Sequence, residues 1–376
     1  MRIPKYSKKD VALTVDSVTA TVEIEATSST AVREGLDLVA VVDMSGSMRG
    51  HKIESVKKAL QFVITKLTPV DRLSIVTFES SIKRLTPLRS MTQAAQSDLK
   101  TIVGRLPERK SSGDPRQVDP GEVSVYTLGF GQGTDDKLLT DIAKKSPGGT
   151  YSTVPDGTNL SAPFAQLLGG LLTVVAQDVR LTLTPKTTNG DLDTTAVAPG
   201  TDYTQTTDAN GVITIKFGTL FSGETRKVAV NFTLKESSET EAYNATLAVA
   251  RHSYAAEETW QPAQNIQRLR TPDPSPPGVA GREERSVQAE EIMDAQNALE
   301  DIMLDDGDRM VNVLRAELLQ LLEYMESQKL YNKLGHPYAL ATLISHGRQR
   351  AAGRGDEEVI SHYVTPRMIA YLEQVK

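Results

Sequence analysis

The sequence contains no cysteine, and this absence removes several kinds of protein chemistry. Without thiols the chain forms no disulfide, no thiolate zinc site such as a RING finger, and no cysteine nucleophile. It also gives no support to an oxidising compartment, where disulfides accumulate.

An excess of positive charge is also missing. The chain has 42 Lys and Arg residues against 48 Asp and Glu residues, which gives a net charge of −6 over 376 residues. Proteins that bind nucleic acid need a basic surface for the phosphates. We therefore expect no nucleic-acid partner.

Long apolar runs are absent as well. The longest, 160–176, contains Ser, Pro, Gln and a pair of glycines and is too short to cross a bilayer. Residues 1–10 carry positive charge, but no apolar region of a secretory signal follows them. We expect a cytoplasmic protein that makes no contact with a membrane.

Catalytic signatures are equally scarce. There is no nucleophile elbow, no phosphate-binding lysine loop and no pair of carboxylates at catalytic spacing, and the five histidines show no metal-ligand spacing. Residues 129–133 are similar to a dinucleotide-binding loop, but Thr134 breaks that fingerprint and Asp135 is expected to cap the next helix. We predict that the chain is not an enzyme.

The most informative stretch is an apolar run that ends in a group of oxygen-bearing side chains. Val and Leu dominate 38–42 without alternation, which is typical of a strand covered on both faces of a parallel sheet. Asp43 follows at the carboxyl end of this strand, and 52–67 has the apolar spacing of a helix that packs on a sheet. Ligands of open α/β sheets bind at that end of the strands.

Asp43, Ser45 and Ser47 offer hard oxygen ligands that suit Mg²⁺. Three side chains do not complete an octahedron, so the sequence predicts only part of a metal site. The alternative interpretation is that Asp43 or Ser45 caps the following helix and that Ser47 is a small polar residue in a turn.

The run Asp43-Met44-Ser45-Gly46-Ser47 resembles the first motif of the metal-ion-dependent adhesion site (MIDAS) of von Willebrand factor type A (VWA) domains. Residues 71–78 and 123–131 resemble later strands of that family, so the resemblance covers 36–176. It implies an α/β fold with a Rossmann-like sheet and helices on both faces. It also implies that Asp43 acts through a bound water, that Ser45 and Ser47 ligate Mg²⁺ directly, and that a partner protein completes the coordination through a carboxylate.

The chain departs from this family pattern between 107 and 122, where no apolar run of strand length occurs. We therefore expect a truncated sheet that lacks the strand next to the first one, together with its preceding helix and the Thr and Asp of the metal motif. Binding of Mg²⁺ should then be weak. Asp114 with Ser111 or Ser112 offers a substitute only in a Gly- and Pro-rich surface turn, and 157–159 matches the missing Thr loop in letters alone.

Deleting a central strand leaves its neighbours with unpaired backbone groups, which are costly when buried. Either the strand at Val123 closes against the first strand, or the domain is damaged. A shortened splice form, an inaccurate gene model and true divergence all remain open explanations of the missing segment.

The rest of the chain changes in character. Alternating apolar residues predict a small antiparallel β-sandwich, and a Pro-rich break is followed by helical spacing. This tail resembles the Vwaint-like helical segment that follows the VWA domain in a plant-type cytosolic subset of the family. The expected units are an N-terminal strand segment that joins the sandwich (1–35), a shortened VWA domain (36–176), a β-sandwich (177–270), a linker (271–282) and a helical tail (283–376).

Three functions follow from this organisation. The first is a non-enzymatic protein–protein interaction module that uses the partial MIDAS. The second is a scaffold or regulatory subunit of a ubiquitin-ligase-type assembly, because similar plant proteins join a RING finger to a VWA domain and this chain would have to pair with a ligase. The third is a shortened variant that has lost metal-dependent binding.

Overall fold

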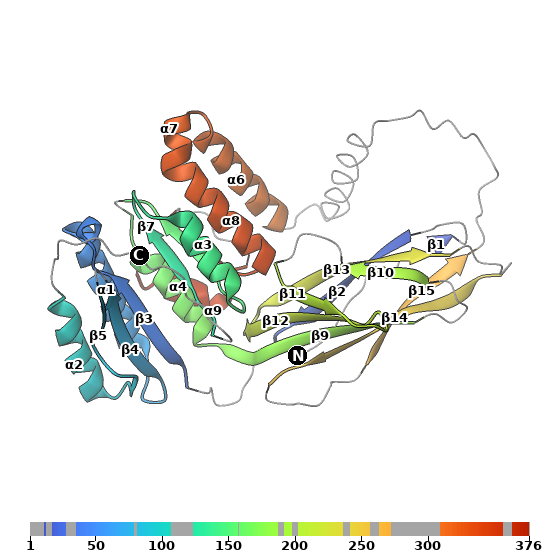
Figure 1. Cartoon of the computed structure of the whole chain (residues 1–376), viewed down its shortest axis with the longest axis horizontal. Coiled ribbons are helices and arrows are strands. Elements are labelled where there is room, and N and C mark those ends of the chain that lie inside the picture. Colours follow the sequence, from blue (N-terminus) through green and yellow to red (C-terminus); the bar gives the residue numbers. More distant parts are fainter. Residues whose placement is uncertain are drawn as a thin grey trace.

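The computed structural model describes residues 11–12, 17–27, 35–78, 81–106, 123–156, 158–186, 192–197, 202–235, 241–255, 263–271, 309–355 and 363–375. The described part is a mixed α/β region, a region of antiparallel sheet and a group of C-terminal helices (Figure 1). Two segments that matter for the expectations above lie outside these residues: the shortened stretch 107–122, and 272–308, which holds most of the linker and the start of the helical tail.

The α/β region alternates strands with helices, as the sequence predicts. Its elements are β3 (Asp37–Asp43), η1 (Gly46–Met48), α1 (His51–Lys66), β4 (Arg72–Phe78), β5 (Ile82–Arg84), β6 (Arg89–Ser90), α2 (Gln93–Gly104), β7 (Thr127–Phe130), α3 (Asp136–Lys145), β8 (Tyr151–Val154) and α4 (Ser161–Leu171). Asp135 caps α3, as predicted: its Oδ1 accepts the Leu138 N–H at 2.9 Å.

Helix α1 lies on the sheet because one of its faces is apolar. Ile53, Leu60 and Ile64 follow each other at helical spacing and are at most 1% exposed. They share a core with Leu73 and Ile75 of β4, and α1 also packs against α4. This core fixes the direction in which β3 leads into the loop before α1.

The other face of β3 corrects the sequence prediction. We expected 38–42 to be covered on both faces, but Val39 is 52% exposed and Val41 is 62% exposed. Leu38, Ala40 and Val42 point to the core side and are partly or fully buried. The unalternating run therefore belongs to a strand that is covered on one face, because no described element packs over Val39 and Val41.

The strands of this region form two separate sheets in the part of the chain that the structure describes. β3 pairs with β4 in parallel, β4 also pairs with β5 and β6, and β7 pairs with β8. The strand expected from Val123 starts only at Thr127, because Val125 donates its N–H to Ser146 Oγ at 2.9 Å instead of joining a ladder. It does not close against β3.

The antiparallel region consists of two sheets that share one apolar core. Its strands are β1 (Val11–Ala12), β2 (Ser17–Glu25), β9 (Val174–Pro185), β10 (Leu192–Val197), β11 (Thr204–Thr207), β12 (Ile213–Phe221), β13 (Thr225–Leu234), β14 (Tyr243–Ser253) and β15 (Gln264–Thr271). The larger sheet has the order β1-β15-β14-β9-β12-β11, and the smaller has the order β10-β13-β2. Strand β2 precedes the α/β region in sequence but pairs with β13, with Glu25 opposite Thr225.

The C-terminal helices return to the α/β region. They are α6 (Arg309–Tyr324), α7 (Gln328–Leu330), η2 (Tyr331–Gly335), α8 (His336–Arg348) and α9 (Pro366–Leu372). Helix α8 packs against α3 and β8, and α9 packs against α4 (Figure 1). None of the helices in the described ranges is both long and apolar enough to cross a membrane.

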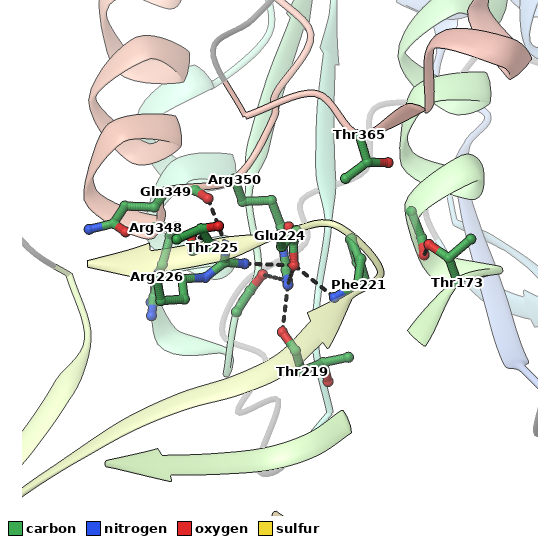
Figure 2. A network of polar contacts seen from close by, with 12 residues as sticks. Thr173, Thr219, Phe221, Glu224, Thr225, Arg226, Arg348, Gln349, Arg350 and Thr365 are labelled. Atoms are coloured by element: carbon green, nitrogen blue, oxygen red, sulfur yellow. Dashed lines mark hydrogen bonds and ion pairs between the residues drawn. The ribbon is translucent and has the colours of Figure 1, made fainter. Parts of the chain in front are cut away.

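A buried ion-pair network joins these regions (Figure 2). Glu224 stands in the turn between β12 and β13, and its two carboxylate oxygens each accept a hydrogen bond from Arg350 at 2.8 Å. Arg226 reaches Oε2 of the same carboxylate at 2.8 Å. Arg350 also donates to the carbonyl of Gly148, before β8, at 2.8 Å. The three charged side chains are at most 3% exposed. The network therefore forms a buried joint between the α/β region, the antiparallel region and the C-terminal helices.

Candidate metal-binding site

The carboxyl end of β3 brings the three predicted ligands together. Asp43 is the last residue of the strand, and its Oδ1 accepts the N–H of Ser45 at 2.7 Å. The hydroxyls of Ser45 and Ser47 lie 2.9 Å apart. Met44, between Asp43 and Ser45, is buried, and its N–H donates to the Phe78 carbonyl at the end of β4 at 2.9 Å, which anchors the loop to the sheet. The anchored turn therefore carries a carboxylate bonded to the Ser45 backbone and two hydroxyls in contact with each other.

The capping interpretation does not describe this loop. The N-cap of α1 is Gly50, which has a φ of 69°, and no side chain caps the helix there. Ser45 precedes the short turn η1 but makes no side-chain capping bond to it. In the described part of the chain, the Asp43 carboxylate accepts the N–H of Ser45, two positions on, and caps no helix. The oxygens of the two serines are thus not used by helix ends.

The spacing of the serine oxygens fits a small cation. Mg²⁺ holds its ligands at about 2.1 Å in an octahedron, so two neighbouring ligands lie about 3.0 Å apart. The 2.9 Å between the Ser45 and Ser47 hydroxyls matches that edge. In the described ranges no cluster of three or more His, Asp or Glu side chains is placed to hold a metal. Asp43, Ser45 and Ser47 would be the protein ligands of a partial site, which stays a prediction that the serine spacing permits.

Of the candidate substitutes, only Thr158 and Asn159 lie among the described residues. Ser111, Ser112 and Asp114 lie outside the described residues. Thr158 donates its hydroxyl to the carbonyl of Pro155 at 2.7 Å, and Asn159 accepts the N–H of Ser161 at 3.0 Å. Both side chains therefore hold the start of α4 in place.

A second polar group at this end of the sheet was missed by the sequence reasoning. Lys52, in the first turn of α1, is 9% exposed and lies 3.4 Å from Oδ1 of Asp156, which follows β8. Its ammonium also donates to the Phe130 carbonyl at 3.2 Å. Asp156 Oδ2 accepts the Gln132 N–H at 3.1 Å. This group ties the start of α1 to the ends of β7 and β8.

The electrostatics of Asp156 follow from these contacts. Burial raises the pKa of its carboxyl, but the hydrogen bond from Gln132 and the charge of Lys52 outweigh it, so the pKa lies below its ordinary value. Gly131 makes the close approach feasible: it has a φ of +70°, and a β-carbon there would stand 1.9 Å from the Asp156 carboxylate. Asp156 and Lys52 are 104 positions apart, so no local pattern predicts their contact. The one signal in the sequence is that Asp156 comes just after a buried strand.

Comparisons with known proteins bear on the family and the fold of the chain. The von Willebrand factor type A domain model matches residues 38–114, and the Vwaint model, described as VWA / Hh protein intein-like, matches residues 308–376. The solved structure of von Willebrand factor type A from Catenulispora acidiphila is similar over 92% of this chain and 88% of that one, with a TM-score of 0.56 and 16% identity, which shows a common fold. The chain is a VWA-domain protein.

The curated relatives are plant proteins. The E3 ubiquitin-protein ligase WAV3 of Arabidopsis thaliana is 30% identical over 242 residues, which are 56% of this chain and 32% of that protein. The E3 ubiquitin-protein ligase WAVH1 of the same plant is 36% identical over 124 residues, 31% of this chain and 16% of that protein. This chain thus carries a VWA domain and a Vwaint C-terminal region and is related to the plant WAV3 family, of whose members it spans a third or less.

Proposed function

We propose that this chain is a protein-interaction module without catalytic activity of its own. It recognises a partner protein at the carboxyl end of β3, in a truncated Rossmann-like VWA domain. Asp43, Ser45 and Ser47 would hold Mg²⁺, which supplies a positive charge for a carboxylate of the partner. The observation that carries the proposal is the pair of serine hydroxyls 2.9 Å apart beside the Asp43 carboxylate.

Thermal unfolding of the full chain, with and without millimolar Mg²⁺ or Mn²⁺, tests the metal. A cation that binds only the folded state, present at roughly ten times its Kd, stabilises the domain by about 1.4 kcal/mol. We expect the transition to rise with metal in the wild type but not in Asp43→Ala. The readout is the rise itself, because Asp43→Ala also loses the hydrogen bond to Ser45.

The matched control is Ser55→Ala, which removes a hydroxyl from α1 that bonds only to the His51 carbonyl. This variant should keep the metal-induced rise, whereas Ser47→Ala should weaken it. A wild-type transition that ignores both cations contradicts the metal part of the proposal. Recognition of a partner would then be independent of metal. The whole proposal fails if substitutions in the loop leave every partner bound.

A second candidate function is that of a scaffold or regulatory subunit in a ubiquitin-ligase assembly. It is favoured by the similarity to WAV3 and WAVH1, whose names record that activity. Because these 376 residues contain no cysteine, a RING-type centre would have to lie outside them. The test is ubiquitin transfer in vitro with purified E1, E2, ubiquitin and ATP. The chain alone should be inactive, and a co-purified complex should transfer ubiquitin.

A further inference from the structure

Among the strands that the structure describes, two of the α/β region have no partner strand on one side. β3 stands at the end of its sheet, with β4 on one side, and β7 pairs only with β8 among the described strands. The exposed apolar side chains of β3 are Val39 and Val41, at 52% and 62%. Large apolar side chains on an unpaired strand edge are uncommon, because such an edge invites pairing with another chain.

The backbone of β3 shows which groups point to the open side. The carbonyl of Leu36 accepts the Arg72 N–H at 2.8 Å, and the N–H of Met44 donates to the Phe78 carbonyl at 2.9 Å. In a parallel strand, alternate residues bond to opposite neighbours. The even-numbered residues of β3 therefore bond to β4, and the N–H and C=O groups of Val39 and Val41 point away from it.

The open side of β7 is set by the same hydrogen-bond alternation, and both strands adjoin helix α4. Thr127 and Gly131 donate their N–H groups to the Thr150 and Val154 carbonyls at 3.0 and 2.9 Å, so the backbone groups of Leu128 point away from β8. Leu38 of β3 and Tyr126, just before β7, both pack on the apolar cluster that contains Leu171 of α4. Figure 1 shows β3 with β4 on one side of α4 and β7 with α3 on the other.

Lys52 links the carboxyl ends of β3 and β7. It belongs to the helix that follows β3, yet its ammonium donates to the carbonyl of Phe130, the last residue of β7, at 3.2 Å. The two open edges are thus held together at their carboxyl ends by a side chain, and by α4 beneath them.

The chain between α2 and β7 is poorly suited to pair with these open edges. Residues 107–122 contain three prolines and a single β-branched apolar residue, Val118. Proline cannot donate to a ladder and is avoided in central strands. A strand beside β3 would turn one face toward α4, so it needs apolar residues at alternate positions as well as backbone N–H groups for the ladder. The composition therefore favours a segment from another polypeptide.

We propose that the open edge of β3 accepts an extended, uncharged strand of a partner protein, rich in β-branched apolar residues, by β-strand addition. The partner's backbone bonds to the N–H and C=O groups of Val39 and Val41, and one set of its alternate side chains covers the exposed valines. Main-chain bonds supply affinity in this mode and side chains supply specificity. The surface is distinct from the Asp43, Ser45 and Ser47 loop and needs no metal.

Amide hydrogen exchange of the full chain, in metal-free buffer, tests the proposal. Without a partner, the Val39 and Val41 amides should exchange faster than those of Ala40 and Val42, which bond to β4. The probe is a short synthetic peptide of alternating Val, Ile and Thr with terminal lysines for solubility. It should slow exchange at Val39 and Val41 by about tenfold or more, in a saturable manner.

Two controls isolate the backbone contribution. The same peptide with alternate amides N-methylated should not bind. In the protein, Val41→Pro removes an N–H from the open edge without touching the bonds to β4, and it should weaken peptide binding by about tenfold, whereas Val41→Thr keeps the N–H and should bind. Circular dichroism shows whether the proline variant is folded, and the methylated peptide decides the question if it is not.

Three results would overturn the proposal. The first is the absence of saturable protection at Val39 and Val41 in the wild type. The second is equal binding of the methylated and unmethylated peptides. The third is protection without peptide that grows with protein concentration, because a second copy of this chain would then occupy the edge.

Discussion

Replacing Glu224 by glutamine should destabilise the protein strongly. The carboxylate accepts two hydrogen bonds from Arg350, one contact from Arg226 and the N–H of Phe221, all at 2.8 Å. Burial raises the pKa of this carboxyl, but the charges of Arg226 and Arg350 outweigh burial and hold the pKa below its ordinary value. Glu224 is therefore ionised when folded, and glutamine removes the charge while keeping the shape.

The size of the effect follows from burial. Arg226 and Arg350 are each 1% exposed, so neither guanidinium can recover its loss from water. Removing one partner of such a buried pair costs about 3–5 kcal/mol. A domain is stable by only about 5–15 kcal/mol, so the change is a large part of the total.

Urea unfolding, followed by circular dichroism, measures this cost. Because Arg350 also binds the Gly148 carbonyl, the variant should loosen the joint between the regions, which limited proteolysis detects. The control is Asp98→Asn, whose partner Arg89 and own side chain are exposed by 31% and 56%, and which should leave the unfolding midpoint unchanged. If Glu224→Gln matched that control, the assignment of the joint to this network would be wrong.

Two further predictions concern other parts of the chain. Leu60→Ala, at a position 1% exposed in the core beneath β3, should lower the free energy of unfolding by about 2–5 kcal/mol. Val41→Ala, at 62% exposure, should change it by less than about 0.5 kcal/mol; equal urea midpoints for the two would contradict the burial pattern. Burial raises the pKa of Glu317, but His346 and Arg354 outweigh burial and lower the pKa. The ionised carboxylate therefore contributes its full share of stability above the ordinary carboxyl pKa, and this contribution is lost as pH falls through the lowered pKa. Unfolding of wild type and Glu317→Gln from pH 6 to 3 should therefore converge in acid, and a constant difference would refute this.

Local patterns predicted much of the fold and part of the site. The apolar run before Asp43 and the helical spacing after it fix a strand, a loop and a helix, and those elements suffice to bring Ser45 and Ser47 together. The cap at Asp135 is equally local, since its bond reaches only three residues ahead. The VWA domain and the Vwaint region were both expected from the sequence and match the family models.

The features that the sequence did not predict depend on contacts between distant segments. The burial of Val39 and Val41 is decided by whether another element packs over them, and an apolar run cannot report that. Lys52 and Asp156 meet only because the ends of β7 and β8 lie beside α1. Glu224 and Arg350 are 126 positions apart, and neither stands in a recognisable motif.

The pairing of β2 with β13 has a consequence for folding during translation. Glu25 leaves the ribosome 200 residues before its partner Thr225. At synthesis rates of about 5–20 residues per second, β2 waits roughly 10–40 s for the strand that will cover it. During that time its alternating apolar residues have no partner from the chain's own later strands, and they form a ready target for a chaperone. The antiparallel region therefore completes its fold late in translation, after the α/β region has been made.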